Sequence, residues 1–578
     1  MLKSRLTASL AFLLLGLLLG CSSADNEPAA TPVAAEEGID LRTAAVAMPD
    51  SYGAAVAEQI LKAGGNAVDA GIAAGLALAV TYPEAGNIGG GGFMLIHMNG
   101  EDSFIDYREK APGAADRDMY LDVDGNVIEG LSLVGHLAVG VPGTVAGFWE
   151  AHQRFGTMPW RDLVMPAVKI AEEGFVVPDK LGGGMLTKLE RYEGKTNFGD
   201  YFGRMESGEL HKQPELAATL GRIAENGVDE FYKGKTAELI VAEMERGNGL
   251  ITMQDLADYE AVWREPVAAD WRGYRVVSAP LPSSGGFGLV QLLKIHDYIA
   301  HHFKGVAHNS AQYVHLVAEI EKRVFADRAQ YLGDPDFIDW RVDELLSDDY
   351  IRRRAQEINP DAISMDVGPG TGLEAHDTTH YSILDQWGNA VSNTYTLNLG
   401  FGSGVVVTGA GFLLNDEMDD FSIKAGVPNA YGVVGSEANQ IEPGKRMLSS
   451  MTPTILLRDG KVAMVVGTPG GSTIFTSVFQ VILNVLDFDM SPLEATGAAR
   501  FHHQLLPPDL ILMQRDSPLP EETLSVLGDR GYKTRSIYNY GDVQMIYDDG
   551  KDVQAASDPR NRGESRVVKL PAGASSDL

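Results

Sequence analysis

The sequence predicts a fold of mixed α and β structure, on two observations. Residues 379–385 alternate between two faces of a strand, with Thr379, Tyr381 and Ile383 on one face and His380, Ser382 and Leu384 on the other. A second run rich in Val, Thr and Tyr follows at 390–398. Together they predict an antiparallel hairpin around Gly388-Asn389. Long segments upstream of the hairpin instead repeat apolar residues at helical spacing. Downstream of it, strand-like runs alternate with a helical run.

The elements before the hairpin follow in chain order. Residues 54–80 are rich in Ala and Leu and are interrupted at Gly64-Gly65-Asn66, which predicts two helices packed through small residues. Strands are expected at 93–96 and 103–107. A long, mostly helical stretch comes next. Its clearest periodic segments are 216–226, 235–246 and 310–331.

Loops and later elements can be placed in the same way. Residues 282–286 are expected to form a turn or loop, and 360–376 lack periodicity and should form a loop. After the hairpin, strands are expected at 454–457 and 462–466, and a helix at 475–486. No stretch in the middle is typical of a domain linker, so one large core is expected.

The string Asp377-Thr378-Thr379-His380-Tyr381-Ser382 carries the strongest chemical signal. If the chain cleaves itself before Thr378, that residue offers a hydroxyl for attack and an α-amine, with a pKa of about 7.7 to 8.0, that takes the hydroxyl proton. If Asp385 faces Asn389, Thr396 lies opposite Thr378 with Cβ atoms about 5 Å apart, whereas a slip of one residue turns Thr396 away. A half-exposed Thr-rich strand would give the same string.

Further motifs flank this string in a particular order and spacing. They are Gly-Gly-Asn-Ala-Val-Asp-Ala (64–70), Gly-Gly-Gly-Gly-Phe-Met (89–94), Asp-Tyr-Arg-Glu-Lys-Ala-Pro (106–112), Gly-Val-Pro-Gly-Thr-Val-Ala-Gly (140–147), Asn-Asp-Glu-Met-Asp-Asp-Phe (415–421), Leu-Ser-Ser-Met-Thr-Pro-Thr (448–454) and Thr-Pro-Gly-Gly-Ser (468–472). With them, the chain resembles the γ-glutamyltransferase family (glutathione hydrolases), a branch of the N-terminal nucleophile hydrolases. The resemblance runs from about Ala44 to about His503.

The resemblance implies an α+β fold, the four-layer αββα sandwich of the N-terminal nucleophile hydrolases, built from two fragments of one precursor. Cleavage between Asp377 and Thr378 would give a large subunit, 43–377, and a small catalytic subunit, 378–578, which form a heterodimer. The loop at 360–376 would hold the scissile bond. Pattern alone predicts only mixed α and β structure.

The resemblance also assigns the reacting groups. Thr378 would be the nucleophile, with the hydroxyl of Thr396 nearby, and the backbone amides of Gly470 and Gly471 would form the oxyanion hole. Without the resemblance, the two glycines would be interpreted as a simple turn after the strand at 462–466.

The substrate-binding residues follow from the resemblance and from the chemistry of a γ-glutamyl group, which carries a carboxylate and an ammonium on one carbon. Arg108 would clamp the carboxylate, because a guanidinium fork suits a planar bidentate partner. The other residues so assigned are Ser449 and Ser450 for the carboxylate, Asn398, Glu417 and Asp420 for the ammonium, and Tyr431 as the gate of a lid at 425–436. The alternatives are a surface ion pair for Arg108, a solvated turn at Asp419-Asp420 and an ordinary surface loop for the lid.

No cofactor or metal is expected. The run Gly89 to Gly92 lacks the spacing of a dinucleotide fingerprint and a following Lys-Ser/Thr, and the resemblance places it close to the active site instead. The adjacent pairs His301-His302 and His502-His503 point apart on a strand or a helix, so neither makes a convincing metal site.

Composition limits the partners. The chain has 578 residues, 47 basic against 79 acidic, for a net charge of -32. That charge argues against nucleic acid or anionic lipid as a partner. It would not attract an anionic substrate over distance, so recognition of a carboxylate must rest on a few local cations.

The N-terminus predicts export. Lys3 and Arg5 precede an apolar run, Leu10 to Leu19, that is too short to span a bilayer. Gly20-Cys21 then resembles a bacterial lipobox, so 1–20 is expected to be a lipoprotein signal peptide, Cys21 the lipidated residue, and 21–42 a flexible tether. The alternative is an ordinary signal peptide with a free cysteine. Cys21 is the only cysteine, so if it is lipidated the folded body contains none, and no disulfide or thiolate metal site is possible.

The resemblance implies a self-processing enzyme that transfers γ-glutamyl groups from glutathione to water or to amino-acid and peptide acceptors, and the N-terminus predicts that it is periplasmic and membrane-anchored. Within enzymes, the alternatives are a cephalosporin (glutaryl) acylase or a poly-γ-glutamate hydrolase of the same family. Outside enzymes, the alternative is an inactive binding lipoprotein that keeps the fold. Intact Thr378, Arg108 and Gly470-Gly471 argue against that last reading.

Overall fold

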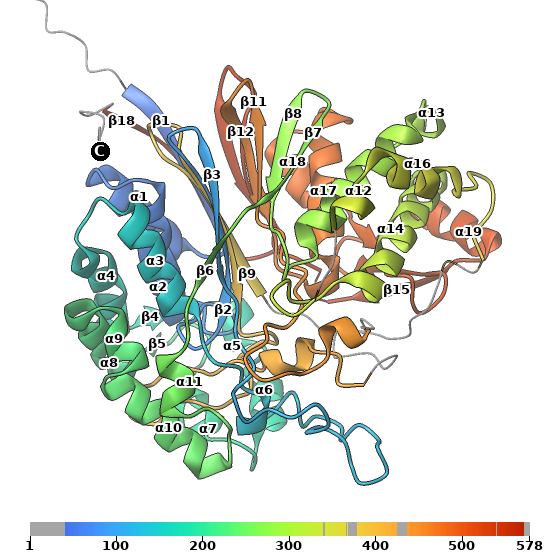
Figure 1. The fold of residues 1–578 in the computed structure, drawn as a ribbon. Helices are drawn as coiled ribbons and strands as arrows, with labels where there is room; N and C mark the ends of the chain where they lie inside the picture. The colour runs from blue at the N-terminus through green and yellow to red at the C-terminus, as the bar shows by residue number, and fades with distance from the viewer. Residues whose placement is uncertain are drawn as a thin grey trace, which may run out of the picture. The chain divides into compact units, whose positions relative to one another are not determined.

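The computed structural model describes residues 41–338, 342–365, 367, 378–424, 436–538 and 540–571. Two large sheets lie face to face in this part of the chain (Figure 1). The first sheet has seven strands in the order β18 (Glu564–Pro571), β1 (Leu41–Met48), β9 (Thr378–Leu384), β10 (Ala390–Thr396), β2 (Gly91–Met98), β3 (Glu101–Tyr107) and β6 (Val262–Arg264).

The second sheet has six strands and packs on the first. Phe93 and Phe104 of the first sheet share one buried apolar cluster with Val277, Ile455 and Val465 of the second, so the facing sides form a core between the sheets. The order is β17 (Val553–Ser557), β16 (Gln544–Asp548), β12 (Lys461–Gly467), β11 (Thr454–Arg458), β8 (Tyr274–Ser278) and β7 (Val267–Trp271).

Helices cover the outer side of each sheet, which completes the expected αββα order (Figure 1). On the first sheet lie α1 (Ser51–Lys62), α2 (Ala67–Thr81) and α3 (Thr144–Phe155), with α4 (Trp160–Glu173) and α8 (Pro214–Asn226) outside them. On the second lie α12 (Gly285–Tyr298) and α17 (Ile474–Leu486), with α14 (Ala311–Tyr331) packed on α12.

Shorter elements fill the connections. The helices are α5 (Asp179–Gly182), α6 (Met185–Tyr192), α7 (Phe198–Phe202), α9 (Val228–Tyr232), α10 (Lys235–Gly247), α11 (Met253–Ala257), α13 (Ala300–Phe303), α15 (Val342–Leu345), α16 (Asp348–Gln356), α18 (Pro492–Gly497) and α19 (Glu521–Arg530). The strands are β4 (Phe175–Val176), β5 (Leu210–His211), β13 (Phe501–His502), β14 (Leu510–Gln514) and β15 (Lys533–Ile537). The 3-10 turns include η2 (Glu417–Asp420) and η4 (Gly471–Thr473).

Helix α2 supports the hairpin from the helical side. Asn66 caps it, since its side-chain oxygen accepts from the backbone N–H groups of Val68 and Asp69. All residues of α2 are buried, and their small side chains let strands β9 and β10 lie close to the helix. The hydroxyls of Tyr381 and Tyr395 donate to backbone carbonyls of α2 at 2.8 and 2.9 Å.

The β9–β10 hairpin confirms the predicted register. Thr378 pairs with Thr396, and Leu384 pairs with Ala390 at the turn. The carboxylate of Asp385 holds that turn by accepting from the backbone N–H of Trp387 at 2.9 Å. The predicted alternation also holds, because Tyr381 and Ile383 pack in the helix-side core and Leu384 in the core between the sheets.

Most predicted elements are present, but the stretch after residue 107 is less helical than expected. Strands β6, β7 and β8 lie in it. They were not predicted from the sequence, because β7, with the sequence Val-Ala-Ala-Asp-Trp, shows little alternation and lies at the edge of its sheet. At the N-terminal boundary, β1 takes in Leu41 and Arg42, the last two residues of the predicted tether.

Some predictions concern residues outside the described part of the chain: the signal peptide 1–20, Cys21, the scissile residue Asp377 and the gate Tyr431. Among the residues that are described, no helix is both long and apolar enough to cross a membrane.

Candidate active site

The two threonines of the hairpin lie in hydrogen-bond reach of each other. Thr378 is 6% exposed, and its Oγ1 is 3.3 Å from Oγ1 of Thr396. Thr396 Oγ1 also accepts from the backbone N–H of Asn398 at 2.8 Å. The hydroxyl of Thr396 is therefore held in place from both sides, and it can donate a hydrogen bond that orients the hydroxyl of Thr378.

The glycine run packs directly behind this pair. A Cβ at Gly90 would lie 2.1 Å from the carbonyl oxygen of Thr396, and one at Gly92 would lie 2.5 Å from that of Thr394. Asn87 ties the run to the hairpin, because its Nδ2 donates to the Thr396 carbonyl at 2.8 Å and its Oδ1 accepts from Gly90 N–H at 2.9 Å. Glycine at these positions is what lets β2 lie so close to β10.

Arg108 follows strand β3 and is completely buried. Its guanidinium donates to Glu417 through one terminal nitrogen and to Asp420 through the other. Glu109 lies 3.7 Å away, and Nε donates to the carbonyl of Met447 at 3.3 Å. Arg108 is thus not a surface ion pair, and its fork is directed at two carboxylates.

Glu417 and Asp420 belong to the 3-10 turn η2, in which residues three apart lie on the same side. This spacing aims both carboxylates at Arg108. Asp419 points elsewhere and accepts from the hydroxyl of Ser132 at 2.6 Å. The segment is largely buried, which excludes the solvated turn considered above.

Burial is the largest cause of the pKa shifts of the carboxyl groups in this cluster. It raises the pKa of Glu417 and Asp420 above their ordinary values, although Arg108 opposes the shift. Burial likewise raises the pKa of Glu109 to about 7. Burial alone would lower the pKa of Arg108, but the three carboxylates around it raise it instead. The arginine stays charged, whereas the carboxyls protonate more readily than exposed ones.

The two predicted serines come from the segment before β11. The backbone of Ser449 bonds to Pro282 and Ser284, which fixes the segment against the start of α12. Ser450 Oγ accepts from Nη2 of Arg328 at 3.1 Å, and Nε of the same arginine donates to Ser284 Oγ at 2.9 Å. Arg328 also lowers the pKa of Asp420 electrostatically, so it is a second cation of the site.

Gly470 and Gly471 lie where β12 leads into η4 and α17. Both have positive φ, 138° and 53°, which only glycine adopts without strain. Because the positive end of a helix dipole favours negative charge, amides at this end are suited to an oxyanion. A simple turn after β12 would not place them at a helix N-terminus.

One small cavity collects most of these side chains, and we call it the narrow cavity. Of the predicted residues, it is lined by Arg108, Thr378, Thr396, Asn398, Glu417, Asp420, Ser449, Ser450 and Gly471. Gly470 lines a neighbouring cavity that shares Thr378. Sequence reasoning missed Arg328, Met451, Ser472 and Ile474, which complete the lining.

The missed residues had weak signals. Arg328 is one of many charged residues along α14, where a charge usually marks a solvated face, yet it is 7% exposed. Met451 and Ser472 lie inside motifs already noted and could have been found there. Within the described ranges, no group of three or more His, Cys, Asp or Glu side chains could hold a metal ion.

Known proteins are similar to this chain in sequence and in structure. A model of the gamma-glutamyltranspeptidase family matches residues 53–568. The glutathione hydrolase proenzyme of Pseudomonas aeruginosa is 61% identical over 526 residues, which cover 91% of this chain and 94% of that protein.

Solved structures are similar as well. A chain of gamma-glutamyltranspeptidase from Pseudomonas nitroreducens, complexed with L-DON, is 58% identical with a TM-score of 0.55, covering 56% of this chain and 96% of that one. Cephalosporin acylase from Bacillus halodurans is 27% identical with a TM-score of 0.78, covering 93% of this chain and 98% of that one.

Proposed function

The chain belongs to the gamma-glutamyltranspeptidase family, and we propose that Thr378 is the nucleophile with which it cleaves γ-glutamyl amides. The γ-glutamyl group then passes to water or to an amino-acid or peptide acceptor, and glutathione is the donor. The name of the Pseudomonas aeruginosa relative, glutathione hydrolase proenzyme, supports both the substrate and a precursor. The observation that carries the proposal is that Thr378, Thr396 and Arg108 line one cavity.

Thr378 first acts on its own chain. Its hydroxyl attacks the carbonyl carbon of Asp377, the resulting ester is hydrolysed, and Thr378 becomes a new N-terminus with a free α-amine. The products are the large subunit, 43–377, which keeps the tether 21–42, and the small subunit, 378–578. The α-amine, with a reference pKa of about 7.7 to 8.0, then takes the hydroxyl proton near neutral pH.

In the catalytic cycle, Thr378 Oγ1 attacks the γ-carbonyl carbon of the substrate, with Thr396 orienting the hydroxyl. The backbone amides of Gly470 and Gly471 stabilise the oxyanion, aided by the positive end of η4 and α17. The C–N bond then breaks, the leaving amine takes the proton, and an ester on Thr378 remains for water or an acceptor amine.

Substrate binding exchanges partners within the charge cluster. Before binding, Arg108 pairs with Glu417 and Asp420. The α-carboxylate of the substrate then binds the guanidinium of Arg108, together with Ser449 and Ser450. The ammonium of the substrate binds the carboxylates of Glu417 and Asp420, together with Asn398. Every charge that loses a partner gains another of opposite sign, so no buried charge is left alone.

A second candidate is the cephalosporin (glutaryl) acylase reaction, which the similarity to the Bacillus halodurans enzyme favours. A glutaryl group has the carboxyl chain but no ammonium. Its binding would leave Glu417 and Asp420 without a cation, which is costly for buried carboxylates. The cluster therefore favours γ-glutamyl substrates.

The two candidates are separated by comparing a γ-glutamyl anilide with a glutaryl anilide. Arg108→Lys keeps the charge but loses the fork, so kcat/KM for the γ-glutamyl compound should fall roughly tenfold to hundredfold, about 1.5 to 3 kcal/mol. Asp420→Ala should hurt the γ-glutamyl compound and spare or improve the glutaryl one. Arg117→Lys, whose side chain is 56% exposed, is the control.

Two results would overturn this assignment. A wild type that prefers the glutaryl anilide would favour the acylase reaction. An Asp420→Ala variant that loses both activities equally, while still folded by circular dichroism, would make Asp420 structural rather than selective.

We also propose a subcellular location for the enzyme. The charged and apolar pattern of residues 1–20 supports export, and Gly20-Cys21 supports cleavage before Cys21 and lipidation of its thiol. The enzyme would then work in the periplasm on a lipid anchor, and 21–42 would act as its tether.

A further inference from the structure

One face of α14 holds a segment of chain that has no regular structure. The segment is 357–364, which follows α16 and contains neither helix nor strand. The α14 side chains that bond to it recur along the helix at the spacing of residues that share a face. They are Gln312, His315, Glu319, Lys322 and Arg323, and we call them the α14 clamp.

The clamp holds the middle of the segment by its backbone. His315 Nε2 donates to the carbonyl of Asn359 at 2.9 Å, and Gln312 Nε2 donates to that of Pro360 at 2.8 Å. Because the acceptors are backbone carbonyls, these bonds fix the path of the chain rather than the position of one side chain.

The end of the segment, Ser364, is held at three atoms. Its backbone N–H donates to Oε1 of Glu319 at 3.2 Å, and its carbonyl accepts from Nζ of Lys322 at 3.1 Å. Its hydroxyl accepts from Nη2 of Arg323 at 3.0 Å. The same nitrogen donates to the carbonyl of Glu357 at 2.6 Å, so it ties the two ends of the segment together.

The clamp places charged groups inside the protein. Glu319, Lys322 and Arg323 are at most 3% exposed, and they pair with one another. Burial alone would raise the pKa of Glu319, but the hydrogen bond with Ser364 and the two cations lower it to about 2. Because buried charges are costly, apolar side chains would serve better if this face of α14 only filled the core. What the charges hold here is the chain at 357–364.

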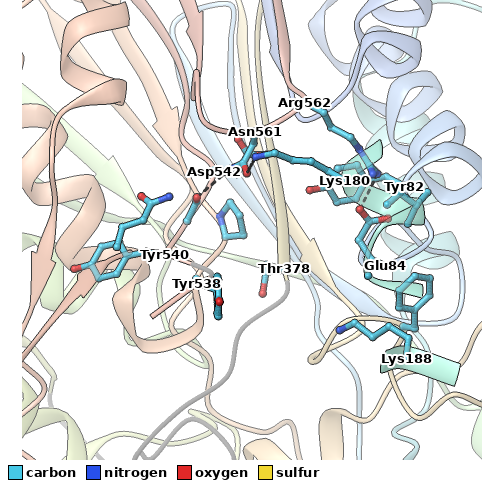
Figure 2. A pocket seen from close by; sticks show the side chains of 17 residues that line it. Tyr82, Glu84, Lys180, Lys188, Thr378, Tyr538, Tyr540, Asp542, Asn561 and Arg562 are labelled. Carbon is cyan, nitrogen blue, oxygen red and sulfur yellow. Dashed lines mark hydrogen bonds and ion pairs between the residues drawn. The ribbon is translucent and has the colours of Figure 1, made fainter. Parts of the chain in front are cut away.

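The segment leads to the Asp377–Thr378 bond. Met365 follows Ser364 and is 78% exposed, so the contacts with α14 end there. Residues 365–377 then connect Ser364 to Thr378. Thr378 is itself fixed, because it begins β9, pairs with Thr396 and lies on the wall of a cavity (Figure 2). The clamp therefore fixes the upstream end of a connection whose downstream end is β9.

We propose that the α14 clamp positions the precursor for self-cleavage, by fixing the upstream end of the connection that carries the scissile bond. The inference rests on the proposed function, because self-cleavage is its first step. In that step Thr378 Oγ1 bonds to the carbonyl carbon of Asp377, and the bond from that carbon to the Thr378 nitrogen breaks. The hydroxyl proton goes to the freed amine, and water then hydrolyses the ester.

The members of the clamp are positioning residues, since they touch the chain upstream of the reacting atoms. The clamp and the segment both belong to the large fragment, and none of the clamp residues lines the narrow cavity or its neighbour. Catalysis by the cleaved enzyme should therefore not depend on them, whereas the rate of cleavage should.

The entropy of loop closure sets the smallest effect to expect. With the clamp intact, the free connection is 365–377. Without it, the free connection starts after α16 and includes 357–364 as well. Since the cost of bringing the ends together grows as (3/2)RT ln n, this lengthening lowers the cleavage rate about twofold. Lost orientation at the scissile bond adds to that effect.

The test follows newly made full-length chain through a pulse of labelled methionine and a chase, with precursor and fragments separated by gel electrophoresis. Arg323→Met removes the tie between Glu357 and Ser364, while Glu319 keeps Lys322 as a partner. It should slow conversion of the precursor by roughly twofold or more. Ser364→Ala removes only the hydroxyl bond and should slow conversion less. For both variants, kcat/KM of the fully cleaved enzyme for a γ-glutamyl anilide should equal that of wild type.

Arg353→Met is the matched control, because this arginine is exposed on α16, and it should be cleaved at the wild-type rate. If Arg323→Met does not fold, as judged by circular dichroism, Ser364→Ala decides alone. Cleavage of the deciding variant at the wild-type rate contradicts the inference. So does a cleaved variant whose kcat/KM has fallen as much as its cleavage rate, since the clamp would then be merely structural. A wild type that is never cut contradicts the proposed function itself.

Discussion

At the scale of single residues, the proposed binding of the γ-glutamyl head group depends on one buried arginine, Arg108, among three buried carboxyl groups. Burial raises the pKa of all three, that of Glu109 to about 7. An ammonium is held only by the ionised form. Since these folded-state values are raised, ionisation is lost as the pH falls through them, and binding of the γ-glutamyl head group weakens toward acid pH.

This argument predicts the effect of Glu109→Gln. The change removes a negative charge that raises the pKa of Glu417, so Glu417 should stay ionised to lower pH. In profiles of kcat/KM for a γ-glutamyl anilide between about pH 5 and 9, the acid limb should move to lower pH. Glu101→Gln, an exposed residue of β3, should keep the wild-type profile. An unmoved acid limb in Glu109→Gln would show that these carboxyls do not control binding.

Most residues that line the narrow cavity were predicted from the sequence, and a few were missed for a physical reason. Thr378, Arg108 and Glu417 lie in short motifs, where neighbours in the chain are also neighbours in space. Arg328 reaches Ser450 from a helix more than a hundred positions away, and nothing in local spacing reveals such a contact.

At the scale of elements, the site depends on how closely β2 approaches β10. The glycine run lets the two strands meet behind Thr396, and α2 supports the other face of the hairpin. The hairpin itself was predictable, because its register follows from alternation and a short turn. Strands β7 and β8 were not, because strands of only five residues carry little periodic signal.

Gly90→Ala tests this close approach. Its Cβ would lie 2.1 Å from the Thr396 carbonyl oxygen, so the strands must separate and displace the Thr396 hydroxyl. We expect a loss of about 1 to 3 kcal/mol in stability and a fall in kcat/KM of roughly tenfold or more. Gly221→Ala in α8, where a Cβ meets nothing within 4 Å, should be neutral or stabilising in thermal melts. Full activity in Gly90→Ala would contradict the role given to this packing.

At the scale of the whole molecule, the proposed fragments are interleaved rather than side by side. In the first sheet, β9 and β10 of the small fragment lie between β1 and β2 of the large one. Cleavage before Thr378 therefore leaves strand pairing intact on both sides of the hairpin. The layer order was predictable only through the family resemblance, because strand pairing between distant segments leaves no local pattern.

A lipid anchor at Cys21 would hold the whole molecule at a membrane. If Cys21 is acylated, Cys21→Ser should move the protein from the membrane fraction to the soluble periplasmic fraction, with its activity kept. The reason is the loss of the acyl chains, in which each buried CH₂ contributes about 0.8 kcal/mol to the free energy of membrane binding. Ser22→Ala, at the next position, is the control and should stay with membranes. Membrane fractionation of Cys21→Ser identical to wild type would contradict lipidation.

The central claim is that Thr378 cleaves its own chain and then serves as the N-terminal nucleophile, and the intact masses of the purified protein test it most directly. Wild type should give two fragments, the smaller of roughly 22 kDa in proportion to its 201 of 578 residues, with threonine as its first residue. Thr378→Ala should give one uncut chain without activity. An uncut wild type that still hydrolyses γ-glutamyl amides would contradict the mechanism.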